Sequence, residues 1–166
     1  DGMWNIHGRY DAERAISRRM PVADVLRAVV DGTHALLGDE IVVLCLEDSD
    51  DGSRTLVESI DGVLERVDEG SACYLPSSLD RVARDADELV MLAPGEGGVV
   101  GRRPVAGGMA VPIRDRDRTL GSLAVATRSP ERVYSSLERE MLLNLAEHAS
   151  VALMDARTVE SVQLAL

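Results

Sequence analysis

The side chains best suited to chemistry in this chain are two cysteines and three histidines. Cys45 lies within an apolar run, and two thiols are too few for a disulfide scaffold or a zinc site. We therefore interpret the cysteines as small buried apolar residues. His7 precedes the ordered pattern, His34 is expected to be partly exposed on a helix, and His148 is expected at a buried or interface position. No two histidines have metal-ligand spacing, so the sequence predicts no metal site.

Patterns typical of an active site are also missing. The sequence contains no Lys, which excludes a P-loop, a Schiff base and a kinase-type phosphate anchor. No serine or cysteine is accompanied by a histidine in a pattern typical of nucleophilic catalysis. The sequence therefore predicts a non-enzymatic domain.

Two loops resemble ligand-binding motifs only superficially. Glu47, Gly52 and Glu58 have the spacing of the first, sixth and twelfth positions of a calcium loop, but Arg54 occupies a core-facing position and both flanks read as strands. We interpret this segment as a hairpin turn. The glycines of 95–101 lack the dinucleotide-binding spacing, and a flexible loop over a cavity is the simpler interpretation.

The composition is acidic and aliphatic. Eighteen basic residues stand against 29 acidic ones, giving a net charge of −11, and only 2% of the residues are aromatic. An acidic surface repels a phosphate backbone, so no direct nucleic-acid binding is expected. The apolar runs are far shorter than the roughly 20 residues of a membrane span, and no signal-peptide pattern opens the chain. We therefore expect no membrane association and a cytoplasmic location.

Hydrophobic periodicity predicts helices at 9–20 and 22–37, the second with Gly38 as its C-cap. A strand buried on both faces is predicted at 41–46, with a hairpin partner at 54–59. The signal weakens over the next 45 or so residues. There we expect a short helix at 78–86, capped by Ser77, and a strand at 88–92. The apolar side of this helix is expected to carry Leu79, Val82 and Ala83.

The carboxy-terminal part has the clearest pattern. Strands are predicted at 109–113 and 120–127, followed by a long helix whose start is a capping box of Ser135 and Glu138. The helix carries an apolar band wider than one sheet-facing stripe requires. Either a partner chain or the amino-terminal helices of the same chain cover the first half of this band, and a partner is favoured after Asp155. The members of the band are Leu137, Met141, Leu142, Leu145, Ala149, Ala152, Leu153, Ala156, Val159 and Val162.

The two ends suggest a piece of a longer protein, because the chain starts at Asp1 and stops inside an apolar-periodic stretch. We expect an amino-terminal helical extension over 1–20, one domain over 21–155, and the start of a helical linker to an output domain over 156–166.

The carboxy-terminal half resembles the GAF domain family of small-molecule sensors. The resemblance rests on the strand motif Met-Ala-Val-Pro-Ile at 109–113, the Gly-Ser-Leu strand within 120–125, the Tyr-Ser-Ser step at 134–136 and the closing helix at 142–153. The segment 22–46 resembles the opening helix and first strand of the family. The resemblance implies an α/β fold of the α+β type: a central antiparallel sheet, with the terminal helices on one face and an irregular ligand cavity on the other.

The resemblance also implies two groups of site residues. A dimerising or signalling surface on the last helix is expected at Leu145, His148, Ala149, Ala152 and Val159. Ligand contacts are expected from the irregular middle and the strand after it, at Cys73, Tyr74, Met91, Arg102 and Met109. Arg102 and Arg103 could contact an anionic ligand or could be solvent-facing loop charges, and the second interpretation is favoured.

No cofactor is predicted. The family's cyclic-nucleotide signature needs Lys and Phe, and the chain contains neither. Bilin-binding relatives use a placed cysteine, but Cys73 lacks the usual aromatic and histidine neighbours. His148 is better explained as a packing residue than as a haem ligand.

The leading hypothesis is a regulatory sensor domain of a multidomain signalling protein, such as a histidine kinase or a transcriptional regulator. It would bind a small, mostly apolar ligand, form a homodimer through its terminal helices, and transmit through the last helix. The alternatives are a ligand-free dimerisation module and, less favoured because it needs a set of cysteines, a free methionine sulfoxide reductase.

Overall fold

A computed structural model describes residues 22–47, 54–69 and 77–165, with backbone only for 67–69 and 157–165. In chain order the elements are α2 (Val22–Leu37), β1 (Ile41–Glu47), β2 (Arg54–Ile60), β3 (Val63–Glu69), α3 (Leu79–Ala86), β4 (Val90–Met91), β5 (Gly98–Val100), β6 (Arg103–Val105), β7 (Gly107–Asp115), β8 (Arg118–Thr127) and α4 (Ser136–Ala165). The predicted helix at 9–20 lies outside the described residues.

Six strands form one antiparallel sheet in the order β3-β2-β1-β8-β7-β4, and β5 pairs with β6 separately. Strand β1 pairs along its length with β2 and with β8, from Ile41 opposite Ile60 and Ala126. A strand covered on both faces has no side that favours polar residues, which explains the continuous apolar run of β1. The predicted α+β fold with a central antiparallel sheet is confirmed.

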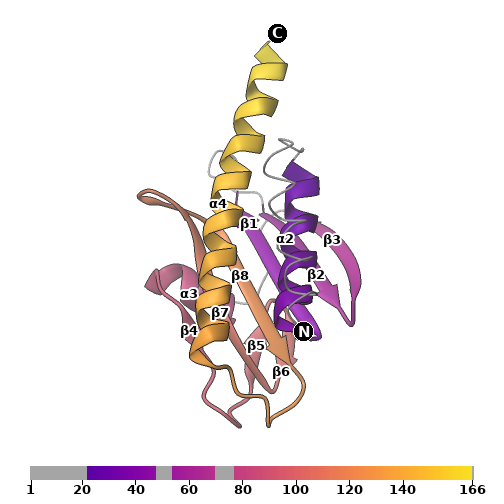
Figure 1. Cartoon of the computed structure of the whole chain (residues 1–166), viewed down its shortest axis with the longest axis vertical. Helices are drawn as coiled ribbons and strands as arrows, with labels where there is room; N and C mark the ends of the chain where they lie inside the picture. The colour runs from indigo at the N-terminus through magenta and orange to yellow at the C-terminus, as the bar shows by residue number, and fades with distance from the viewer. Residues whose placement is uncertain (1–21, 48–53, 70–76, 166) are drawn as a thin grey trace.

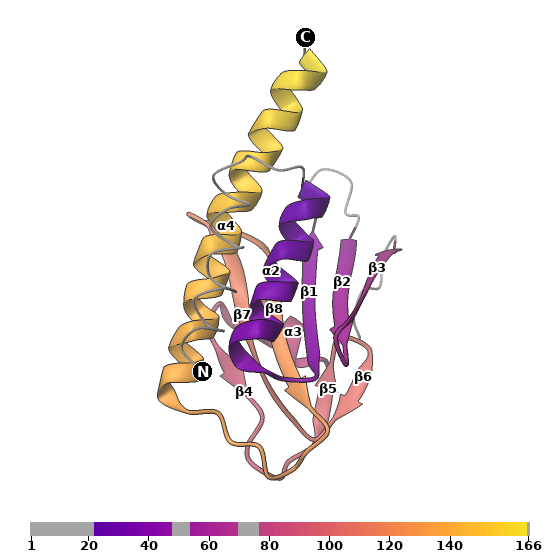
Figure 2. The ribbon, with the colours of Figure 1, turned by 45° about the vertical axis from the view of Figure 1, so that its right-hand side comes forward.

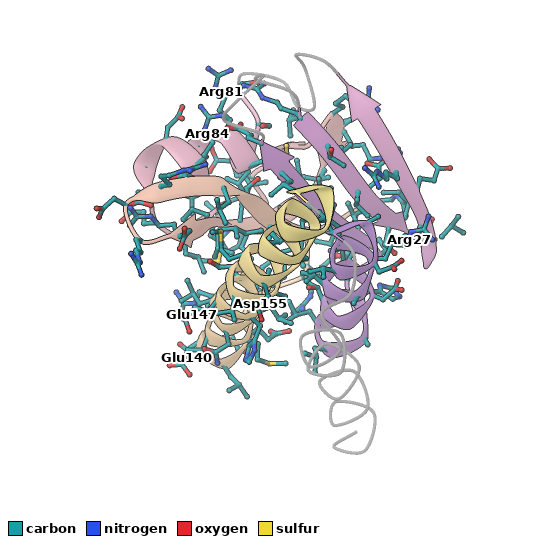
Figure 3. The ribbon with its side chains drawn as sticks, turned by 90° about the horizontal axis from the view of Figure 1, so that it is seen from above. Arg27, Arg81, Arg84, Glu140, Glu147 and Asp155 are labelled. Atoms are coloured by element: carbon teal, nitrogen blue, oxygen red, sulfur yellow. The ribbon has the colours of Figure 1, made fainter. Side chains whose placement is uncertain are left out.

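Helices α2 and α4 lie side by side on one face of the sheet (Figures 1 and 2). Val42 and Leu44 of β1 point into this layer and pack in one core with Leu26 of α2 and Leu153 of α4. The alternate residues of β1, Ile41, Val43 and Cys45, lie on the opposite face. Helix α3 and the β5–β6 hairpin cover that face. Figure 3 shows the two layers from above, with α2 and α4 on one side and α3 on the other.

The start of α4 has the predicted capping box. The Ser135 N–H donates to Glu138 Oε1 at 3.0 Å, and the Glu138 N–H donates to Ser135 Oγ at 3.1 Å. Arg132 ties this start to the end of α2: its Nε donates to Asp39 Oδ1 at 3.0 Å, and its Nη1 donates to Glu138 Oε1 at 3.0 Å. The guanidinium also lies over the Tyr134 ring, 4.4 Å from its centroid. These contacts fix the position of the start of α4 relative to the end of α2.

The apolar band of α4 is covered largely by its own chain. Leu145, Ala149 and Ala152 are buried in the core beneath α2 and above the sheet, which favours the intrachain alternative for this part of the band. These three side chains are therefore not exposed for a dimer contact, and their role in signalling stays a prediction. His148 is exposed, not buried. Val159 lies where only the backbone is described. The outward side of α4 exposes Leu137, a member of the predicted band, together with Leu143 and Val151.

Several local expectations differ from the structure. The N-cap of α3 is Ser78, whose Oγ accepts from the Arg81 N–H, rather than Ser77. Strand β4 is only two residues long. Strands β3, β5 and β6 were not predicted, because short segments rich in charge or glycine carry little periodic signal. The predicted hairpin turn after β1 lies partly outside the described residues.

Candidate ligand site on the sheet face beneath α3

Small side chains line the sheet face that α3 covers. Ala124 of β8 stands between Val43 of β1 and Ala110 of β7, and Ser122 stands opposite Cys45. Residues two apart on a strand point to the same face, so Ser122 lies on the same face as Ala124. All five are fully buried. The small residues let α3 and the β5–β6 hairpin approach the sheet closely.

Two ion pairs join the carboxyl end of helix α3 to the strands, in addition to the packing of Leu79 and Ala83 on this face. Arg84 forms an ion pair with Glu47 at the end of β1, and Asp87 in the left-handed C-cap accepts from Arg114 of β7 at 2.8 Å. The side chains of Asp87 and Arg114 are about two-fifths exposed, at 40% and 41%, so this second contact contributes little stability. The amino-terminal end of α3 carries the polar group of greatest interest.

Asp80 is a charged residue inside the layer between α3 and the sheet. Its side chain is fully buried, and its Oδ2 accepts a hydrogen bond from the Gly101 N–H in the β5–β6 turn. Its Oδ1 has no hydrogen-bond partner among the described residues. Burial raises the pKa of Asp80 to about 6, and the Gly101 hydrogen bond only partly opposes this shift. No basic side chain contributes to the pKa shift, so the buried carboxylate lacks a counter-charge within the described part of the chain.

A second charged group on this face is already paired. Glu58 of β2 has a side chain only 5% exposed, and Arg103 of β6 donates to its Oε1 from Nη2 at 2.9 Å. This hydrogen bond raises the pKa of Arg103, and Glu65 on the neighbouring strand adds to the effect. Glu58 and Arg103 therefore neutralise each other.

Two further polar atoms near this face are buried without a partner among the described residues: Ser122 Oγ and Arg103 Nε. A buried donor or acceptor left unsatisfied costs about 1–3 kcal/mol. Together with Asp80 Oδ1, these atoms are unsatisfied polar groups among side chains that are otherwise aliphatic. Such a surface is typical of ligand sites, where a few polar groups orient a molecule against apolar walls.

A separate small pocket lies at the other end of the sheet, beside the start of α4. Its volume is about 30 Å³, enough for water but not for an organic ligand. Met91, Gly108, Arg132 and Tyr134 are among its lining residues. Burial and the nearby Asp39 carboxylate raise the pKa of Tyr134, so this phenol stays neutral at ordinary pH.

Of the predicted ligand residues that the structure describes, Met91 of β4 and Met109 of β7 are direct cross-strand partners, whereas Arg102 lies apart from them in the β5–β6 turn. Met91 lines the small pocket, and Arg102 is exposed in the β5–β6 turn. Met109 is fully buried on the helical face, a position that does not fit the predicted ligand contact. Cys73 and Tyr74 lie outside the described residues. Arg103 pairs with Glu58, and its side chain is 43% exposed, so it is both an ion-pair partner and partly solvent-facing.

The site residues that sequence reasoning missed are Asp80, Ser122 and Glu58. For Asp80 the signal was the phase of α3: the predicted apolar side included Val82, which is 46% exposed, whereas Asp80 is buried. Rotating the predicted helix to bury position 80 would have placed a carboxylate in the core. For Ser122 and Glu58, alternation along their strands predicts which face of the sheet each side chain lies on. It does not predict that Glu58 pairs with Arg103 or that Ser122 Oγ has no hydrogen-bond partner among the described residues.

A family model described as the GAF domain matches residues 21–153. Because this match spans most of the sequence, the chain belongs to the GAF domain family. Domains of this family are generally regulatory modules. A search of curated protein sequences gave no match.

Several solved structures have the same fold, and two of the three described next are GAF domains. The GAF domain of a phosphoenolpyruvate-protein phosphotransferase from Coxiella burnetii is 15% identical, with a TM-score of 0.69 over 97% of this chain and 99% of that chain. The GAF domain of a two-component sensor histidine kinase from Bacillus halodurans is 16% identical, with a TM-score of 0.65 over 85% and 99%. Free methionine-R-sulfoxide reductase from Neisseria meningitidis, solved with its substrate, is 14% identical, with a TM-score of 0.62 over 93% of each chain. These identities establish the fold alone.

Two further observations concern partners and metals. Within residues 22–47, 54–69 and 77–165, no helix is both long and apolar enough to span a membrane. Across the same described residues, no three His, Cys, Asp or Glu side chains are grouped as a metal ion would need.

Proposed function

We propose that this chain is a sensory domain that binds a small molecule on the sheet face beneath α3 and transmits binding through α4. The observation that carries the proposal is the set of buried polar atoms without partners on that face, chiefly Asp80 Oδ1 and Ser122 Oγ. Native proteins satisfy nearly all such atoms, so those that remain call for a specific explanation. One such explanation is a ligand that supplies the missing hydrogen bonds, and this explanation also agrees with the chain's membership of the GAF family.

Transmission follows from the two-layer arrangement around the sheet. On β7, Ala110 belongs to the core beneath α3, and its neighbour Met109 belongs to the core beneath α4. A ligand that shifts α3 therefore changes packing on a strand that α4 also contacts. The ligand acts only to the extent that its affinity differs between the two arrangements of α4. The Arg132 contacts with Asp39 and Glu138 keep the base of α4 attached to the body.

The binding step is tested by screening the purified domain against a metabolite panel by thermal shift and by native mass spectrometry. We expect at least one compound to bind, and we expect Ala124→Leu to remove binding because the larger side chain fills the face. Val63→Leu, at an exposed position on β3, is the matched control. Absence of any bound compound, or binding that survives Ala124→Leu, contradicts the proposal.

The transmission step is tested by distances between spin labels on the two helices. Arg27→Cys on α2 and Glu147→Cys on α4 are both exposed and can be labelled in a Cys73→Ser background, since Cys45 is buried (Figure 3). We expect the compound found above to change the distance distribution. An unchanged distribution at saturating compound contradicts transmission through α4.

A ligand-free dimerisation module is the second candidate function. The observation that favours it is the exposed apolar side chains Leu137, Leu143 and Val151 on the outward side of α4. Light scattering on wild type and on Leu143→Glu/Val151→Glu distinguishes the candidates. A wild-type dimer that the double substitution converts to a monomer supports this role, and a strict wild-type monomer contradicts it.

We infer that the domain does not itself catalyse a reaction. The Cys45 thiol is fully buried between β2 and β8, whereas a catalytic thiol must reach its substrate. The parent protein on this proposal is a cytoplasmic signalling protein, such as a sensor kinase or transcriptional regulator, whose output lies in another domain. A thiol-dependent methionine sulfoxide reductase assay tests the inference, and turnover above a Cys45→Ala/Cys73→Ala control contradicts it.

A further inference from the structure

The sheet face beneath α3 has an imbalance of charge that specifies a class of ligand. The Glu58–Arg103 pair is internally neutral, and the next acidic side chain that acts on Arg103, Glu65, adds further negative charge at the rim. Asp80 is fully buried and carries a charge that no basic side chain compensates within the described part of the chain. The missing group is therefore a cation.

The free atoms also specify how that cation is held. Asp80 Oδ2 is engaged by the Gly101 N–H, which leaves Oδ1 to accept a hydrogen bond from a ligand. Ser122 Oγ on the floor of the same face offers a second acceptor. A primary ammonium group carries three donors, so it can serve both acceptors and keep a third donor. Hydrogen bonds between charged partners are about twice as strong as neutral ones.

The surrounding side chains limit the rest of the ligand. On the sheet side of this layer, the residues around the polar atoms are Ala110, Ala124, Ala126 and the aliphatic Val43 and Leu56, and in the closed arrangement Leu79 and Ala83 of α3 pack against them. The aromatic stacking surfaces that a planar ring system uses are missing among these residues. The ligand body that such a surface favours is a short alkyl chain of a few carbons.

The closed arrangement of α3 is compatible with entry of such a molecule. Without a ligand, Asp80 is buried with half of its carboxylate unsatisfied, which destabilises the closed state and lowers the free energy needed to lift α3. Lifting α3 breaks the partly exposed Asp87–Arg114 contact, which contributes little stability, and also the Arg84–Glu47 ion pair and the packing of Leu79 and Ala83. A cation bound to Asp80 restores what the closed state lacks.

We propose that the face beneath α3 takes a small aliphatic primary amine, whose ammonium group binds Asp80 and Ser122 and whose alkyl chain packs on the alanines of β7 and β8. This proposal rests on the proposed sensory function and names the ligand class of that site. Butylammonium, 1-butanol and butyrate form a matched set of probes, because they share an alkyl chain and differ in charge. At pH 7.5 the amine is protonated.

The experiment titrates the ¹⁵N-labelled 166-residue chain with each probe and follows the backbone amides. We expect butylammonium to shift the amides of Asp80, Gly101 and Ala124 with an affinity in the millimolar range, typical of a fragment of this size, while the other two probes shift them little. Equal shifts by 1-butanol or butyrate overturn the proposal.

Variants locate the binding. Asp80→Asn keeps the shape of the side chain and is expected to weaken butylammonium binding about tenfold or more. Asp85→Asn, an exposed carboxylate on the same helix, removes the same charge and is the matched control. Ala124→Leu fills the floor and is expected to remove binding, which keeps the test valid if Asp80→Asn folds poorly. Unchanged affinity in Ala124→Leu, or in a folded Asp80→Asn, overturns the proposal.

The proposed function and this ligand class fail in different ways. If a neutral or anionic compound from the metabolite panel binds at Ala124 and butylammonium does not, the ligand class is wrong and the sensory function stands. If neither the panel nor any of the three probes binds, both proposals are wrong.

Discussion

Asp80 is the residue whose environment departs furthest from what its chemistry favours. A carboxylate buried without a counter-charge is costly, and the cost appears as a pKa raised from 3.8 to about 6. Residues of this kind are concentrated at functional sites, because a core selected only for stability has no use for them. The paired Glu58 on the same face shows the alternative, in which a second side chain supplies the missing charge.

The raised pKa of Asp80 predicts a pH dependence of stability. Between pH 3.8 and about 6 the unfolded chain has lost this proton while the folded chain still holds it, so the free energy of unfolding falls as pH rises through that window. A shift of this size corresponds to about 3 kcal/mol. Urea unfolding of wild type and Asp80→Asn at several pH values measures it, and we expect the variant to lose this component. An identical pH profile for the two proteins contradicts the burial of an ionised Asp80.

Arg132 joins three parts of the chain through one guanidinium group. It bonds Asp39 after α2 and Glu138 in α4, and the Arg132 hydrogen bond lowers the pKa of Glu138 to about 2. We expect Arg132→Ala to reduce the free energy of unfolding by about 3 kcal/mol, because it leaves the buried Asp39 without its charged partner. Chemical denaturation measures this change. Arg128→Ala, which breaks an exposed ion pair with Asp61, is the control and is expected to change the free energy of unfolding far less than Arg132→Ala does.

The stabilisation by the Arg132 contacts is also expected to be lost at low pH. Glu138 has a folded pKa below its ordinary value of 4.5, so its contribution is complete above that pH and is lost as pH falls toward 2. This direction is opposite to that of Asp80, so the two groups can be distinguished in one pH series.

At the scale of the elements, α4 has two unlike sides. The inner side packs against α2 and the sheet, and the outer side carries Glu140 and Glu147 next to exposed apolar residues (Figure 3). This division decides which positions of the helix stabilise the fold and which remain for an intermolecular contact.

The division predicts opposite results for two neighbouring leucines. Leu145 is 6% exposed, and Leu145→Ala is expected to lower the free energy of unfolding by about 2–5 kcal/mol through the cavity it leaves. Leu143 is 42% exposed, and Leu143→Ala is expected to cost less than about 1 kcal/mol. Urea denaturation at low protein concentration measures both without a contribution from association. Equal losses would show that the inner and outer sides of α4 are wrongly assigned.

At the scale of the whole molecule, the acidic charge acts on any contact between copies. The net charge is −11, and acidic residues stand beside the exposed apolar side chains of α4. If two copies associate through this side, like charges approach each other, and salt screens their repulsion. We therefore expect the dimer of the second candidate function to strengthen as NaCl rises from about 50 to 500 mM, with sedimentation equilibrium as the measurement. A dimer that weakens with salt contradicts association through α4.

Much of the fold follows from local sequence patterns. The alternation and apolar runs that place β1, β2, β7 and β8, the period of α2, and the Ser135–Glu138 capping box are each properties of a few neighbouring residues. Their order along the chain is also what resembles the GAF family, which is why the family could be identified before the structure was considered.

The site could not be predicted in the same way, because it depends on contacts between distant segments. The rotation of α3 about its axis decides that Asp80 is buried and Val82 is exposed, and only packing against β7 and β8 sets that rotation. Sheet register decides that Met109 points to the helices and Ala110 to α3, since a shift of one residue exchanges the two faces. The sequence alone determined the elements, the family and the excess of acid. The tertiary structure decided which of those acids is left in the core without a counter-charge, because the free energy of a buried charge depends on what surrounds it in space.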